Sequence, residues 1–370
     1  MTLATLPTTL GRSTLITLAA ALAASLVAFA LEVFAPTADT AVFVGAAIAL
    51  AALAVLIGSG TEQLGRRLGP RATGILQSAL GNLPELLISI FALQAGLVVV
   101  VQTALVGSIL ANTLLVLGLA FLLGGLRHGT QRFHAPSVRS ISTLLVLAVA
   151  ALAIPTLATA PGAPDVGHAV DVSVICSIVL LGVFVASIPF SIGGGPGASA
   201  EVEAESDAIE RMWPLGVALA LLAVASVGAA VMSDLFVEHL RPGMATFGLS
   251  EQFVGLVVVA VAGNAVENVV GIRLAAADKT DLATSVILNS SLQVAIALIP
   301  ALVLISLAIG TTPLTLVLSP LLLGALGLST VLAALIVFDG ESTWLEGLAL
   351  LGLYVIVAAG VWFGPAILAT

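Results

Sequence analysis

Long apolar stretches follow one another along almost the whole of this 370-residue chain. Each contains roughly 20 residues with almost no charge, which is the length that a helix needs to cross the hydrocarbon core of a bilayer. The stretches are continuous rather than alternating, so they predict spanning helices and not the strands of a membrane barrel. We expect eleven spans, at residues 13–34, 40–60, 72–95, 97–124, 139–159, 169–192, 213–236, 249–274, 281–308, 313–338 and 344–366.

The composition supports an all-α polytopic membrane protein, because 60% of the residues are apolar and only 8% are charged. A soluble domain of this length would need far more polar surface. Lys and Arg are sparse and form no basic patch, which argues against nucleic acid as a partner. The apolar stretch after Arg12 is longer than the ~7–15 apolar residues of a signal peptide, so we interpret it as the first spanning helix.

The positive charges fall on one side of the predicted membrane. If the N-terminus is cytoplasmic, ten of the eleven Lys and Arg residues lie at cytoplasmic ends, and only Arg241 lies outside. Cytoplasmic loops carry an excess of positive charge, so we expect a cytoplasmic N-terminus. The compact chain and its short tails indicate a prokaryotic plasma membrane.

A glycine-rich and acidic segment at residues 193–212 divides the chain. We expect an N-terminal extra helix at residues 1–37, a first five-helix repeat at 38–192, and a second at 213–370. Because five is odd, the second repeat enters the membrane from the opposite side, which makes the two halves inverted repeats. The acidic segment is a solvated connector or a cytosolic Ca²⁺ sensor, and we favour the connector.

Two glutamates stand in matching motifs in the two halves. The first motif is Gly81-Asn82-Leu83-Pro84-Glu85 and the second is Gly263-Asn264-Ala265-Val266-Glu267, 182 residues further along. The same offset relates Ser108 to Ser290. A carboxylate inside a bilayer costs several kcal/mol on insertion scales, about 2.5–3.5 for an acid at the helix centre, so a duplicated one predicts a functional site.

Polar side chains recur at helical spacing around these glutamates. Asn82 precedes Glu85 by three residues, and Asn264 precedes Glu267 by three, so each pair shares a helix face. Gly81, Pro84 and Gly263 also predict breaks in the two helices, which would free backbone carbonyls. The candidate cation- and proton-binding residues are Glu85, Glu267, Asn82, Asn264, Ser108, Asn112, Ser290 and Gln293.

This set offers only oxygen ligands, which suits a hard cation such as Ca²⁺ rather than Zn²⁺ or Cu. Protons bind to the same carboxylates, so cation and proton exclude one another. Two carboxylates balance one Ca²⁺, and two protons neutralise the empty site. We therefore expect antiport of a divalent cation with at least two protons, since an empty, doubly charged site would be penalised in the membrane.

The same pattern of polar residues is compatible with other functions. A Na⁺/H⁺ or Na⁺/Ca²⁺ exchanger, or an Mn²⁺ exchanger, could use the same scaffold. A gated channel fits two inverted repeats with one pair of acids less well than alternating access does. An intramembrane hydrolase is disfavoured because no apolar span offers a Ser/His pair or two aspartates. The polar residues other than the glutamates could also hold helices together, at ~0.6 kcal/mol per bond.

Several motifs resemble the calcium/proton exchanger family of the cation/calcium exchanger superfamily. They are Thr61-Glu62, Leu68-Gly69-Pro70, Gly81-Asn82-x-x-Glu85, the run Val106 to Gly118, Phe253-Val254-Gly255, Gly263-Asn264-Ala265-x-Glu267, Ser290-Ser291-Leu292-Gln293 and the run Asp339 to Gly347. The resemblance covers residues 58–363. It implies eleven helices, transport without a cofactor or enzymatic activity, and alternating access by movement of the first helix of each repeat against the rest.

The resemblance also implies roles for single residues. Glu85 and Glu267 would carry the cation and the protons, Asn82 and Asn264 would ligate or shape the site, and Ser290 and Gln293 would complete the set of metal ligands. The chain departs from the family pattern at Leu83-Pro84, at Asn268 and at Asn289. We expect the bilayer, the cation and protons as partners, with a homo-oligomer left open.

The four histidines, His128, His134, His168 and His239, fall in predicted loops. A role in sensing pH is one interpretation of them. We favour the alternative that all four are ordinary loop residues.

Overall fold

The computed structural model describes residues 10–35, 37–68, 80–163, 166–192, 212–309 and 312–362, and it is almost entirely helical. The first half contains α2 (Arg12–Phe34), α3 (Asp39–Leu68), α5 (Leu83–Gln94), α6 (Val98–Leu110), the π-helix η2 (Ala111–Val116), α7 (Leu117–His128), α8 (Ala135–Ala158) and α9 (Ala169–Ile192). The second half contains α11 (Leu215–Glu238), α12 (Leu240–Phe247), α13 (Glu251–Phe253), η3 (Val254–Val259), α14 (Ala260–Gly263), α15 (Ala265–Ala276), α16 (Thr280–Gln293), η4 (Val294–Leu298), α17 (Ile299–Ile309), α18 (Pro320–Ile336) and α19 (Trp344–Trp362). Two short strands, β1 (Gln131–Arg132) and β2 (Glu341–Ser342), pair antiparallel.

The helices have the length and hydropathy of membrane spans. Within the described residues eight helices are long and apolar enough to cross a bilayer, and α12 with α13–α14, bent by 113°, would make a ninth. Two shorter apolar helices, α5 and α18, lie among them. The chain is therefore an integral membrane protein of many helices, as the hydrophobic pattern predicts.

Helix boundaries repeat along the chain. Helix α5 covers residues 83–94 and α15 covers 265–276, so both ends differ by 182 positions. Helices α6 and α16 begin at residues 98 and 280, and α7 and α17 begin at 117 and 299, again 182 apart. A π-helical segment lies at the matching place in each half, with η2 between α6 and α7 and η4 between α16 and α17. The offset found in the sequence motifs thus extends to the secondary structure around them.

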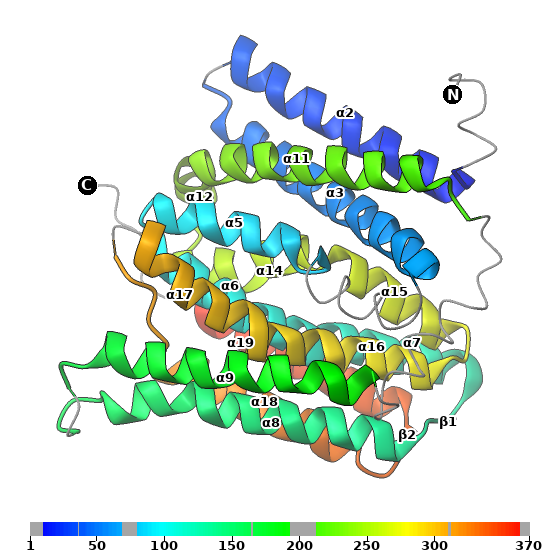
Figure 1. The fold of residues 1–370 in the computed structure, drawn as a ribbon, viewed down its shortest axis with the longest axis vertical. Helices are drawn as coiled ribbons and strands as arrows, with labels where there is room; N and C mark the ends of the chain where they lie inside the picture. Colours follow the sequence, from blue (N-terminus) through cyan, green and yellow to red (C-terminus); the bar gives the residue numbers. More distant parts are fainter. Residues whose placement is uncertain are drawn as a thin grey trace.

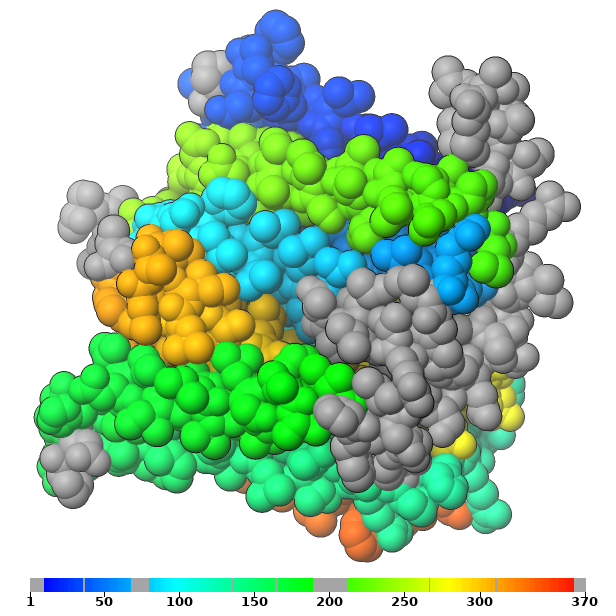
Figure 2. All heavy atoms as spheres, viewed as in Figure 1, coloured from blue at the N-terminus to red at the C-terminus, as the bar shows by residue number. Residues whose placement is uncertain are grey.

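The helices are stacked in layers. Figure 1 shows α2, α3 and α11 on one side of the molecule and α8, α9 and α18 on the other, with α5, α6 and α14–α17 between them. Figure 2 shows α11, α5, α17 and α9 as successive bands across one face. In an apolar window of 18 residues within the continuous span α6–η2–α7, 83% is buried inside the protein. The corresponding share in α2 is 17%, and apolar side chains such as Leu26 and Phe29 are exposed there. The outer helices present their apolar surface to lipid, and α6–η2–α7 forms the centre of the bundle.

The predicted span 313–338 is wrong at its start. Residues 313–319 form neither helix nor strand, and α18 begins only at Pro320, where Ser319 caps the helix by accepting a hydrogen bond from the backbone N–H of Leu322. Irregular backbone inside a helical bundle needs hydrogen-bond partners. Side chains of neighbouring helices provide them in Gln102→Thr315 O (2.8 Å), Thr156→Leu316 O (2.9 Å), Leu316 N→Ser173 (2.9 Å) and Leu314 N→Ser306 (2.9 Å).

Three loops at the predicted cytoplasmic ends are joined. The strand pair β1–β2 links the α7–α8 loop to the α18–α19 loop, with Arg132 bound to Glu341 at 3.0 Å. Gln131 donates to Asp278 (2.7 Å) in the α15–α16 loop and to the carbonyl of Ala275 (3.1 Å) in the last turn of α15. The predicted linker at 193–212 lies outside the described residues except for residue 212, and so does the start of the predicted span 72–95.

Candidate functional site

Both motif glutamates lie in the first turn of a helix that begins inside the bundle. A turn at Gly81 and Asn82 precedes α5, and a turn at Asn264 separates α14 from α15. The predicted helix breaks are confirmed. Pro84 is accommodated in the first turn of α5, where the backbone N–H it lacks would have no intrahelical partner. The positive end of each helix dipole therefore lies beside a carboxylate, as at half-helix ends in transporters.

Glu85 is fully enclosed by protein, with 0% of its surface exposed. Neither of its carboxylate oxygens has a hydrogen-bond partner among the described residues. Ser108, Asn264 and Glu267 are its polar neighbours. Its side chain also lies against the second motif, because a Cβ placed on Gly263 would meet the Glu85 Cβ at 3.3 Å. The two sequence motifs therefore meet at Glu85, while Glu267 is only partly buried.

Two amide–hydroxyl pairs cross between the halves. The Asn264 amide nitrogen donates to the Ser108 hydroxyl at 2.8 Å, and the Asn112 amide nitrogen donates to the Ser290 hydroxyl at 3.1 Å. The carbonyl oxygens of both amides, Asn112 Oδ1 and Asn264 Oδ1, are buried without a partner in the described part of the chain. Each amide thus offers a free carbonyl oxygen, the group that a hard cation prefers.

A close helix crossing holds these side chains together. A Cβ on Gly107 would lie 2.4 Å from the Leu256 carbonyl oxygen, and one on Gly255 would lie 2.5 Å from the Val100 carbonyl oxygen. Only glycine fits at these two positions, because the backbones of α6 and η3 are in direct contact. This contact brings Ser108, one residue after Gly107, within reach of Asn264.

The other two predicted site residues are less connected. Asn82 is 8% exposed at the break before α5, and its side chain does not cap that helix. Gln293 is partly buried at the junction of α16 and η4. No recorded hydrogen bond ties either side chain to the other six predicted residues over the ranges that the structure describes. The structure therefore groups four of the eight residues around Glu85, namely Glu85, Glu267, Ser108 and Asn264, and joins two more, Asn112 and Ser290, in a pair one helical turn along from Ser108.

Two further oxygens were not predicted. Ser89 Oγ, one turn after Glu85 on α5, and Asn268 Oδ1, directly after Glu267, are both buried without a partner within the described ranges. The i, i+4 spacing of Glu85 and Ser89 was the available signal for the first. The second appeared in the sequence only as a departure from the family motif.

The chemistry of the cluster depends on neutral oxygens as well as on the two carboxylates. Among the described residues no three His, Cys, Asp or Glu side chains lie close enough to hold a metal ion. A cation bound here would therefore be held by two carboxylates together with amide and hydroxyl oxygens. Such a ligand set suits a hard cation whose charge two carboxylates balance.

Comparison with known proteins finds one family. The model described as "Sodium/calcium exchanger protein" matches residues 38–193 and 217–363. The chain is 36% identical over 344 residues to a protein of Synechocystis sp. named Ca(2+)/H(+) antiporter, covering 88% of this chain and 92% of that one. It is also 36% identical over 322 residues to Ca(2+)/H(+) antiporter ChaA of Bacillus subtilis, covering 85% and 89%.

Solved structures with the same fold include YfkE, whose native form superposes with a TM-score of 0.79 at 31% identity, covering 94% of this chain and 99% of that one. A sodium–calcium exchanger, NCX_Mj, superposes with a TM-score of 0.54 at 18% identity, covering 92% and 98%. The second likeness concerns the fold alone.

Proposed function

Because the chain belongs to the sodium/calcium exchanger family, we propose that it is a Ca²⁺/H⁺ antiporter that exchanges the two ions at one site in the middle of the membrane. Two relatives that carry this name are each 36% identical to it over the aligned residues. The observation that supports the site most strongly is the buried Glu85, which has no hydrogen-bond partner among the described residues and lies against Gly263 of the second motif.

In the proposed mechanism, Glu85 and Glu267 bind the cation and, in its absence, the protons. The carbonyl oxygens of Asn112 and Asn264 would serve as neutral ligands, since the hydroxyls of Ser290 and Ser108 hold the amide nitrogens of these two residues. Asn82 and Gln293 complete the site when it closes around an ion. No resident cofactor takes part, since the exchanged ions are themselves the substrates.

The proposed architecture has eleven spanning helices. Residues 1–37 form an extra helix, 38–192 and 213–370 form inverted five-helix repeats, and 193–212 form a cytoplasmic linker. The matching boundaries of α5 and α15 support the repeat, and the distribution of positive charge supports a cytoplasmic N-terminus in a prokaryotic plasma membrane. Movement of α3 and α11 against the other helices would expose the site to one side at a time.

Flux measurements in liposomes test this function. Purified protein is reconstituted, and Ca²⁺ uptake is followed under an imposed pH gradient, an imposed Na⁺ gradient, or neither. We expect uptake to follow the pH gradient and to ignore Na⁺, with proton movement in the opposite direction. Uptake that responds to Na⁺ but not to the pH gradient would identify a sodium-coupled exchanger instead and would overturn the proposal.

A further inference from the structure

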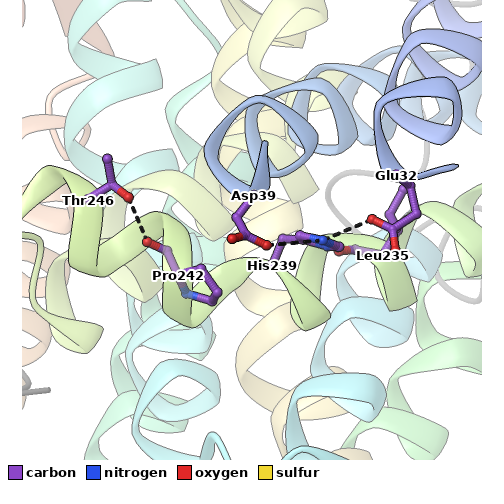
Figure 3. A network of polar contacts seen from close by, with 6 residues as sticks. All are labelled: Glu32, Asp39, Leu235, His239, Pro242 and Thr246. Atoms are coloured by element: carbon purple, nitrogen blue, oxygen red, sulfur yellow. Dashed lines mark hydrogen bonds and ion pairs between the residues drawn. The ribbon is translucent and has the colours of Figure 1, made fainter. Parts of the chain in front are cut away.

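A second group of titratable side chains lies far from the glutamate motifs, at the junction of α11 and α12. His239 is 7% exposed there, although the sequence analysis favoured an ordinary loop residue. Figure 3 shows its ring between Glu32 at the end of α2 and Asp39 at the start of α3. The Nε2 atom lies 2.9 Å from Glu32 Oε2 and 3.5 Å from Asp39 Oδ1. That prediction for His239 is wrong, because the ring links three helices.

The hydrogen bonds of the ring specify how many protons it holds. Nδ1 lies 3.0 Å from the Leu235 carbonyl oxygen, and Nε2 lies 2.9 Å from the Glu32 carboxylate. A backbone carbonyl can only accept a hydrogen bond, and so can an ionised carboxylate. A neutral imidazole has one N–H, so it would turn one bare nitrogen toward an oxygen lone pair. Both contacts are satisfied only when the cluster holds one additional proton, on the ring or shared with Glu32.

The surroundings make the contact depend on that proton. The other charged groups of α11 and α12, Asp234, Glu238 and Arg241, are exposed, and no ion pair or hydrogen bond joins them to His239 within the described ranges. The charged groups that contact the His239 ring in the described part of the chain are therefore the carboxylates of Glu32 and Asp39. Without the proton, Glu32 and Asp39 would face each other across a neutral ring, which like charges disfavour.

The junction also has a packed apolar base. Phe43 of α3 stacks on Phe236 of α11 with ring centroids 4.9 Å apart, and it lies against Gly243 of α12. Helix α3 in turn packs against α14 and α15, which border the glutamate site. A contact that fastens the end of α2 to α3 and α11 therefore acts on the helix whose movement the proposed mechanism requires.

We propose that His239, Glu32 and Asp39 form a second proton-binding site, separate from the transport site, that fastens α2 to α3 and α11 when protonated. The proton would come from the solution at the outer ends of these helices. This assignment of the side rests on the orientation given under the proposed function. At alkaline pH the proton leaves and the contact opens. The site would therefore adjust the mobility of α3 to the external pH.

Hydrogen–deuterium exchange of the purified full chain in detergent tests this site without any transport assay, so its outcome is independent of the exchange activity. Backbone exchange is compared between the wild type and His239→Gln in the segments around residues 28–43 and 232–244. Taking the ratio of the two at each pH cancels the chemical effect of pH. We expect wild-type exchange to be about tenfold slower than that of His239→Gln at about pH 6, and equal to it near pH 8.5.

A matched control comes from His168, directly before α9, which lies 3.1 Å from Asp171 in the first turn of that helix in an exposed pair. His168→Gln should exchange like the wild type at every pH. Glu32→Gln provides a second variant of the junction and should also lose the pH dependence. A ratio that does not change with pH, or the same change in His168→Gln, would overturn the proposal.

Discussion

The side-chain amide of Asn264 donates a hydrogen bond of 2.8 Å to the hydroxyl of Ser108, which lies 156 residues earlier in the chain. Asn112 and Ser290 make the reverse connection at 3.1 Å, from the first half of the chain to the second. In both pairs the amide nitrogen faces the serine, and the amide oxygen is buried without a partner among the described residues. The hydroxyls therefore orient two amide carbonyl oxygens.

Replacing Ser108 by Ala should disturb this orientation without removing a charge. The Asn264 amide would lose its hydroxyl partner, retain the Ala260 carbonyl as an acceptor, and rotate more freely. We expect the apparent KM for Ca²⁺ to rise about tenfold with a smaller change in maximal rate, since a buried hydrogen bond contributes ~1 kcal/mol and the ligand geometry adds to it.

Ser291→Ala is the matched control for this change. Ser291 is equally buried and adjacent to Ser290, but its hydroxyl donates to the Ile287 carbonyl of its own helix. Concentration-dependent uptake in proteoliposomes compares the two variants. Equal KM values in both would show that the Ser108 hydroxyl does not orient the site.

A methyl group at Gly107 should separate the two helices that carry the site. A Cβ there would lie 2.4 Å from the Leu256 backbone oxygen, so the backbones must move apart. We expect Gly107→Ala to lower stability by ~1–3 kcal/mol and to abolish most transport. Gly182→Ala on α9 is the control, because nothing lies within 4 Å of its Cβ position. Thermal unfolding in detergent measures both, and an unchanged midpoint for Gly107→Ala would contradict the direct backbone contact.

Protons and Ca²⁺ should compete for the same oxygens. Lowering the pH on the loading side protonates the carboxylates, so the apparent KM for Ca²⁺ must rise as the pH falls. The limiting slope is about tenfold per pH unit for one competing proton and about a hundredfold for two. Initial uptake rates at varied Ca²⁺ and pH give this slope. A KM that does not depend on pH would mean that the cation does not displace protons from Glu85 and Glu267.

The turn before α19 offers a test of stability alone. Thr343 and Glu346 form a capping box, with Thr343 N→Glu346 Oε2 at 2.8 Å and Glu346 N→Thr343 Oγ1 at 3.3 Å. We expect Thr343→Ala to lower stability by ~1 kcal/mol and to leave the KM for Ca²⁺ unchanged. Ser140→Ala, which removes an exposed hydroxyl from α8, should do neither. A large effect of Thr343→Ala on KM would assign this turn a role in transport.

Much of this fold could be predicted from the sequence, since the bilayer requires long apolar helices and penalises isolated charge. The spacing of Thr343 and Glu346 is that of a capping box, and the structure forms one. The helix breaks beside Glu85 and Glu267 were recognisable from Gly81 and Gly263. These features depend on residues that are close together in the chain.

Features that depend on tertiary partners were not predictable. Residues 313–319 are apolar enough for a helix, yet they form none, and Gln102, Thr156 and Ser173 accept or donate hydrogen bonds along their backbone. The partner of Ser290 is Asn112, whereas the repeat alone would have suggested Asn82. His239 meets Glu32 of α2, which is 207 residues earlier in the chain, and no local pattern indicates this contact.

The most direct test of the glutamate site is Ca²⁺ uptake driven by a pH gradient in liposomes containing the wild type, Glu85→Gln, Glu267→Gln or the exposed control Glu238→Gln. Each variant replaces one ionisable carboxyl group by a neutral amide and keeps the shape of the side chain. We expect uptake to fall by about a hundredfold or more in Glu85→Gln and in Glu267→Gln, and to stay at the wild-type level in Glu238→Gln, because an unbalanced charge in the occupied site is costly. Wild-type uptake in either Glu85→Gln or Glu267→Gln would contradict the account.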